Sequence, residues 1–373
     1  NSMRGTRIER VKIAAQRIIS KLTPEDIISI VDFNDRASVI IPATPVKDKN
    51  ALAAMVSMIK PGGGTEIFHG LSEGVKQNHT YLAPRMINHI ILLTDGHTFG
   101  DQEQCIELAK EAARAGISIS AMGLGTDWND DFLDELASST GGASTYIKSA
   151  GAVTSFFDAQ VKSLVNAFAE RMSLSVAPDP DIVPEMAFQL APSPQEVAIN
   201  DDGRIPLSSL QPQRPIKLLL QFQLPPDMKE GFRPIARIVA NGDILQNRKQ
   251  AYKAISDISL EVTPEPPREE PPPAIMDALS RLTLYRMQER AKEALDDGNV
   301  TEATRRLENL ATRLLEIGEG NLAQQTLAEA ENISNTHMLS AKGHKTIKYQ
   351  TRALLAQGGL GKALSTLLTS PDE

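Results

Sequence analysis

The first part of the chain, up to about residue 170, alternates between strand-like and helix-like segments, and this alternation restricts the fold more than any other feature. Three apolar runs, at residues 89–94, 117–123 and 144–147, are each followed by a segment of helical length and periodicity. Strands that alternate with helices predict a doubly wound, Rossmann-like α/β domain with a mostly parallel sheet. In such a domain, ligands bind beyond the carboxyl ends of the strands.

Two further elements are predicted before these units. Residues 6–9, Thr-Arg-Ile-Glu, have the pattern of a capping box at the start of a helix. An apolar run at 27–33 is followed by a turn and by a second run at 37–41, after which come Pro42 and Pro45. Proline favours a sheet edge, so this pair is expected to form an antiparallel hairpin there.

Three loops in this part carry oxygen-bearing side chains. Ser2 lies at the very start of the chain, Thr65 follows three consecutive glycines, and Asp95 ends the apolar run of residues 89–94. Two hydroxyls and a carboxylate are hard oxygen ligands of the kind that Mg²⁺ prefers. The sequence therefore predicts a magnesium site made by Ser2, Thr65 and Asp95.

These three motifs together resemble the metal-ion-dependent adhesion site of von Willebrand factor type A domains. Members of that family carry Asp-x-Ser-x-Ser on the first loop, Thr on the second and Asp on the third. Ser2 matches the last Ser, whereas the leading Asp and the earlier Ser would precede Asn1. We therefore expect a chain truncated within this motif, without the first central strand. The alternative is a true start at Met3 and a sheet that is incomplete.

The resemblance implies a function as well. In such a site the carboxylates act mainly through water, so the charge of the Mg²⁺ stays under-compensated and attracts an Asp or Glu side chain of a partner protein. We expect a non-catalytic protein-interaction module, with no catalytic residues and no cofactor other than Mg²⁺. A first alternative is a subunit that docks to an AAA-type or chelatase-like ATPase complex.

A second alternative is a metal-dependent hydrolase. His69, His97, Asp95 and Asp101 supply imidazole and carboxylate groups, although their spacing matches no zinc pattern. A phosphate-binding loop is excluded because no Lys follows the triple glycine. Each site residue also has an ordinary structural interpretation: Ser2 as an exposed loop residue, Thr65 as a helix cap and Asp95 as a turn former.

Other conspicuous residues also admit structural roles. Trp128, the only tryptophan, lies in a polar loop that either leads into a helix capped by Asp127 or Asn129, or presents an interface anchor. We expect His89 to be a hydrogen-bonded structural residue and Cys105 to be a packing residue.

The remaining chain changes character twice. Residues 171–263 show short strand patterns between turns, which predict a β-sandwich of about seven strands. Residues 264–273 form a Pro-rich linker, and residues 274–373 form a helical domain with helices expected at 274–297, 300–317, 319–333 and 342–357. The helix pairs are similar to tetratricopeptide-like hairpins, although no 34-residue repeat is present. The α/β domain covers residues 1–170.

Composition excludes several classes of partner. The 39 Lys and Arg residues are outnumbered by 47 Asp and Glu residues, which gives a net charge of −8 and argues against nucleic-acid binding. No apolar run approaches the roughly 20 residues that span a bilayer. A single cysteine excludes an intrachain disulfide. We expect a cytoplasmic protein, while the first residues leave export open.

Overall fold

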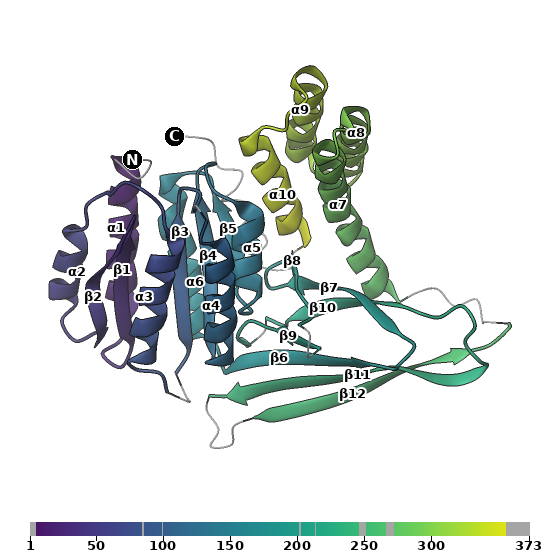
Figure 1. The fold of residues 1–373 in the computed structure, drawn as a ribbon, viewed down its shortest axis with the longest axis horizontal. Helices are drawn as coiled ribbons and strands as arrows, with labels where there is room; N and C mark the ends of the chain where they lie inside the picture. Colours follow the sequence, from purple (N-terminus) through teal and green to yellow (C-terminus); the bar gives the residue numbers. More distant parts are fainter. Residues whose placement is uncertain are drawn as a thin grey trace. The chain divides into compact units, whose positions relative to one another are not determined.

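The computed structural model describes residues 5–83, 86–98, 100–200, 203–212, 214–245, 251–265 and 272–355 (Figure 1). These residues divide into two compact units. The first, here called the N-terminal unit, takes the described residues up to 187 together with those in 196–216 and 220–264. The second, the helical unit, takes 188–195, 217–219 and the described residues from 265 onward. The division into four segments expected from the sequence stays a prediction.

A three-stranded parallel sheet lies at the centre of the N-terminal unit. Its order is β3 (Asn88–Thr94), β4 (Ile117–Leu124) and β5 (Ser144–Ile147). Each strand is followed by a helix: α4 (Gln102–Arg114), α5 (Asp130–Ser138) and α6 (Ala150–Val165). β4 is buried at seven of its eight positions because it pairs on both sides. The three predicted strand–helix units and the α/β class are confirmed.

The predicted hairpin is present but belongs to a separate sheet. β1 (Ile27–Phe33) pairs antiparallel with β2 (Ala37–Pro45), and within the described residues β1 is not hydrogen-bonded to β3. The separation of β1 from β3 agrees with the expectation of a sheet without its first central strand. The expectation that the hairpin forms the edge of the parallel sheet is wrong, because the described residues of the two sheets are not hydrogen-bonded to each other. Helix α3 (Ile67–His79) contacts both strands, with Gly70 against Phe33 and Gly74 against Ile90.

The start of helix α1 (Thr6–Lys21) differs from the prediction. Gly5, at φ 73°, is the N-cap residue, and no side chain caps the helix. Thr6 already lies inside the helix, and the Glu9 carboxylate pairs with Lys12 at 3.0 Å instead of reaching back. The capping box is therefore wrong, because the helix begins one residue earlier than that motif requires.

Seven described strands follow β5, in two sheets. One is antiparallel, in the order β12 (Tyr252–Val262), β11 (Gly231–Ile244), β6 (Ala169–Pro178) and β9 (Arg204–Pro206). The other has the order β10 (Lys217–Gln223), β7 (Val183–Ala191) and β8 (Gln195–Glu196). Phe222 of β10 packs against a buried cluster that includes Ile235 and Ala236 of β11. A complete sandwich is not clearly shown, because β12 is exposed along almost its whole length.

The helical unit contains the four predicted helices, and the largest difference from the expected bounds is in the third, which ends at Thr336 instead of residue 333. They are α7 (Pro273–Asp296), α8 (Val300–Glu316), α9 (Gly320–Thr336) and α10 (Ala341–Leu355). Their shared core includes Leu307, Leu310, Leu314, Leu322 and Ile333. Within the described part of the chain, no helix is both long enough and apolar enough to cross a membrane. Most of the Pro-rich linker, residues 266–271, lies outside the described residues.

Candidate metal site

Two of the three predicted ligands come from neighbouring loops. Asp95 directly follows β3, and its side chain is 7% exposed. Thr65 lies two residues before α3. A Cβ atom placed on Gly96 would lie 2.8 Å from the Thr65 Oγ1 atom, so the Thr65 hydroxyl lies against the Asp95–Gly96 turn. Ser2 lies outside the described residues.

The triple glycine shapes the loop that carries Thr65. A side chain on Gly62 would overlap Asn34, and one on Gly64 would overlap Asp35. Gly64 also has φ 81°, a left-handed conformation that glycine adopts without strain. The Glu66 amide then donates to the Asn34 carbonyl at 2.9 Å. The glycines thus allow the loop to lie on the turn between β1 and β2, which positions Thr65 without any phosphate-binding role.

The start of α3 does not use Thr65 as a cap. The Ile67 amide donates to the Thr98 hydroxyl at 3.1 Å, and the Phe68 amide donates to the Asp101 carboxylate at 2.8 Å. Thr98 in turn donates to Asp101. Residues from the loop after β3 therefore satisfy the first amides of the helix, and the capping role considered for Thr65 is wrong.

Arg7 is a neighbour of Asp95 that the sequence did not reveal. Its Nη1 atom lies 3.5 Å from the Asp95 Oδ2 atom, a long contact for an ion pair. The same guanidinium lies close to the Gly125 turn after β4. A buried carboxylate is costly unless its charge is compensated, so the place beside Asp95 favours a cation.

The residues considered for a hydrolytic centre have other roles. Asp101 caps α3, His69 pairs with Glu66 at 2.9 Å on the surface, and His97 is exposed. Among the described residues, no three His, Cys, Asp or Glu side chains come close enough to hold one metal ion. The predicted cluster of Asp95, Asp101, His69 and His97 is therefore not formed, and a site rich in hydroxyls fits the local chemistry better.

Trp128 is a core residue rather than an interface anchor. It is 1% exposed, its ring packs over Gly123, and its Nε1 atom donates to the Gly125 carbonyl at 2.7 Å. Asn129 caps α5 by accepting a hydrogen bond from the Phe132 amide at 3.1 Å. Of the two caps considered in the sequence, Asp127 and Asn129, the structure therefore has Asn129. Cys105 is also buried, and burial, followed by the charge of Asp101, raises the pKa of its thiol to about 12. The structural interpretation is confirmed for both Trp128 and Cys105.

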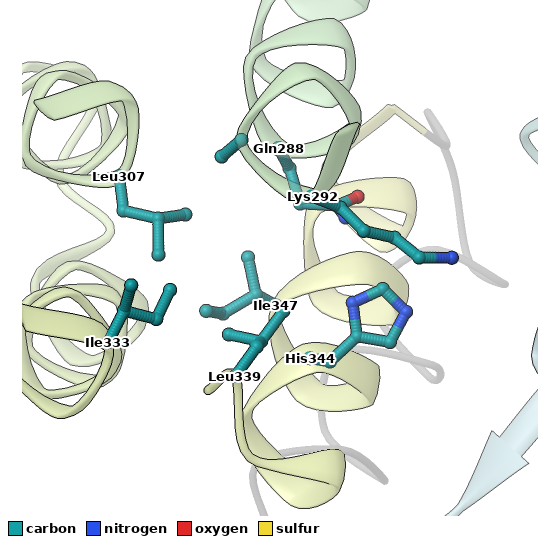
Figure 2. Close-up of a pocket in the computed structure, with 8 residues that line it drawn as sticks. Gln288, Lys292, Leu307, Ile333, Leu339, His344 and Ile347 are labelled. Carbon is teal, nitrogen blue, oxygen red and sulfur yellow. The ribbon is translucent and has the colours of Figure 1, made fainter. Parts of the chain in front are cut away.

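The helical unit contains a small, partly open cavity, shown in Figure 2. Its volume is about 10 Å³, which is room for about one water molecule. Its lining includes Gln288, Leu307, Ile333 and Ile347. The cavity is too small to bind a metabolite.

The fold and the loop geometry agree with a comparison against known families. Residues 1–159 match the von Willebrand factor type A domain. This match and the α/β fold support a von Willebrand factor type A domain in this part of the chain. Domains of this kind are typically protein-interaction modules. Residues 273–357 match the Sll0103-like C-terminal alpha-helical domain, a relationship that the sequence patterns did not reveal.

Relatives and solved structures extend this assignment. Protein sll0103 of Synechocystis is 30% identical over 208 residues, which cover 55% of this chain and 49% of that protein. Human inter-alpha-trypsin inhibitor heavy chain H2 is 29% identical over 153 residues, 38% of this chain and 16% of the heavy chain. The chain thus spans about half or less of the length of these curated relatives.

Two solved structures share the fold over most of the chain. A von Willebrand factor type A protein from Catenulispora acidiphila has a TM-score of 0.74 at 15% identity, covering 93% of this chain and 85% of that one. The ArnB paralog VWA2 from Sulfolobus acidocaldarius has a TM-score of 0.52 at 14% identity, covering 96% and 87%.

Proposed function

We propose that the von Willebrand factor type A domain binds an Asp or Glu side chain of a partner protein through Mg²⁺, without catalysing a reaction. Thr65, Asp95 and Ser2 would hold the ion, directly or through water. The observation that supports this proposal most is the meeting of the Thr65 hydroxyl with the turn that carries the buried Asp95 carboxylate. Hydroxyl and carboxylate oxygens are ligands that Mg²⁺ accepts.

Electrostatics supports the carboxylate partner. A bound Mg²⁺ would supply a positive charge, and the described part of the site offers one carboxylate, Asp95, to balance it. Arg7 adds a further positive charge beside that carboxylate. An ion with so few anionic ligands retains attraction for an external anion, so a partner carboxylate would complete its coordination.

The test is a binding experiment on a chain that carries the family's Asp-x-Ser ahead of Asn1. Thr65→Ala and Asp95→Ala should each weaken partner capture by roughly 1 to 3 kcal/mol, the scale of a hydrogen bond to a charged group. EDTA should have the same effect on the unmodified chain. Thr80→Ala, at the exposed end of α3, is a matched control that should leave capture unchanged. Capture that ignores both EDTA and the Asp95 change would contradict the proposal.

A further inference from the structure

Strand β12 is an end strand with a free outer edge. It pairs with β11 on one side, and among the described strands none pairs with its other side. Residues Tyr252 to Glu261 are exposed, and only Val262 is half-buried. The edge of a strand from Lys253 to Val262 on which no described strand pairs is a template on which another strand can add.

On the face of the sheet that carries the buried cluster, β12 presents apolar side chains that the cluster does not cover. Ile258 lies opposite Ala236 of β11, so both side chains project from the same face of the sheet. On that face Ala236 is buried with Ile182 and Ile235, whereas Ile258 is 38% exposed and Leu260 is 45% exposed. The hydrophobic layer therefore continues onto β12 but is only partly covered there.

The sequence of β12 is complementary to itself in the antiparallel direction. With a two-fold axis at Asp257, Lys253 of one copy lies opposite Glu261 of the other, on both sides of the axis. The same register places Ala254 opposite Leu260, and it aligns all eleven residues of the strand. An axis at Ser256 would place Lys253 opposite Ser259, and an axis at Ile258 would place it opposite Thr263. Only the axis at Asp257 forms the two Lys–Glu pairs over the whole strand.

This register also brings the two copies of Asp257 together, and the fold compensates their charge. Asp257 accepts two hydrogen bonds from Arg237 of β11, at 2.7 Å and 3.0 Å. A dimer would therefore carry a row of Arg237, Asp257, Asp257 and Arg237 across the joined sheets, with no net charge. The like-charge repulsion that would otherwise oppose the pairing is offset.

We propose that two copies of this chain associate through β12, antiparallel and around a two-fold axis at Asp257. The two four-stranded sheets then form one continuous sheet, with about ten hydrogen bonds between the copies. Such a contact is self-complementary and closed, because each copy offers the same strand to the other. The paired strands extend the apolar layer that carries Ile258 and Leu260.

Charge reversal at the ends of β12 tests this register. Lys253 and Glu261 are both exposed, so changes there should leave the fold intact. Sedimentation or light scattering against concentration should show the unmodified chain as a dimer. Lys253→Glu places a glutamate opposite Glu261 of the other copy at both ends of the contact. The repulsion in these two pairs should raise the dissociation constant at least about tenfold. The double change Lys253→Glu with Glu261→Lys restores opposite charges and should restore the dimer.

Two results would overturn the proposal. One is a monomer at about 100 µM, well above the dissociation constant of a micromolar complex. The other is a dimer that the single charge reversal does not weaken. Amide exchange on β12 distinguishes other occupants of the edge, because protected β12 amides in a monomeric chain would show that a different segment pairs there.

Discussion

At the scale of single residues, His89 illustrates how burial constrains an ionisable group. Its Nδ1 atom lies 2.6 Å from the Ser118 hydroxyl and its Nε2 atom lies 3.0 Å from the Ser120 hydroxyl, so the ring joins β3 to β4. A neutral imidazole can donate at one nitrogen and accept at the other, which suits two hydroxyls. Burial lowers the pKa of His89 from 6.5 to about 4.

Stability should therefore fall in mildly acidic solution. Because the pKa of His89 is lower in the folded chain, the unfolded chain takes up the proton first as pH falls from 6.5 to about 4. The contribution is fully present above pH 6.5, and the loss across this window should be on the order of 2 to 3 kcal/mol. His89→Gln should flatten that part of the profile, whereas His79→Gln, an exposed change, should not. Urea unfolding followed by fluorescence at several pH values is the measurement.

Individual site residues were predictable to different degrees. Thr65 and Asp95 stand out because residue type and position after a glycine run or a strand can be seen in the sequence. Arg7 does not, because 88 residues separate it from Asp95 and only the placement of α1 brings them together. Trp128 was ambiguous because its polar loop looks exposed, while the space above Gly123 that receives its ring depends on the fold.

At the scale of elements, the glycines of α3 set how closely the helix approaches the strands. A Cβ atom on Gly70 would lie 2.6 Å from the Phe33 ring, too close without movement of the helix or the ring. Gly70→Ala should therefore destabilise the N-terminal unit by about 1 to 3 kcal/mol, the usual cost of overpacking. Thermal unfolding measures this loss.

Gly74 is the matched control on the same helix. Its added Cβ would lie 3.7 Å from the Ile90 Cδ1 atom, an ordinary contact. Since Ala is favoured over Gly in a helix by up to about 1 kcal/mol, Gly74→Ala should be neutral or stabilising. Equal losses from both changes would show that helix α3 does not approach β1 as described.

Long, strongly patterned elements were predictable, and short or irregular ones were not. The strands and helices from β3 to β5 follow directly from their apolar runs. Helix α2 (Lys49–Ser57) was missed, although Asp48 caps it by accepting from the Ala51 amide at 2.9 Å. The position of strand β7 is not evident from the sequence, because its buried residues do not form a clear alternation. The separation of β1 from β3 was expected from the missing part of the site motif, because the strand that would lie between them precedes that motif.

At the scale of the whole molecule, the two units offer separate probes of unfolding. Trp128 is the only tryptophan and lies in the N-terminal unit, so its fluorescence reports that unit. Leu310 is 0% exposed in the core of the helical unit. Leu310→Ala should destabilise the helical unit by about 2 to 5 kcal/mol, the cost of a large-to-small change in a core.

In the Leu310→Ala variant, the unfolding transitions seen by circular dichroism and by Trp128 fluorescence should separate. Circular dichroism should show part of the helical signal lost at a lower temperature, while the transition seen by Trp128 fluorescence stays in place. A matching shift of both transitions would mean that the units unfold together. The sequence predicted the broad order of α/β, β and helical regions at this scale, but not the division of β7 and β10 between the two units.

The capping of α3 also has a mechanical consequence. Thr98 and Asp101 hold the first amides of this helix, and both belong to the loop that begins at Asp95. A partner anchored at Thr65 and Asp95 would therefore pull on two loops that are tied to the same helix end. Tension applied there would act on these hydrogen bonds at the same time and would not detach one loop before the other. We therefore expect the two loops and the start of α3 to resist force together.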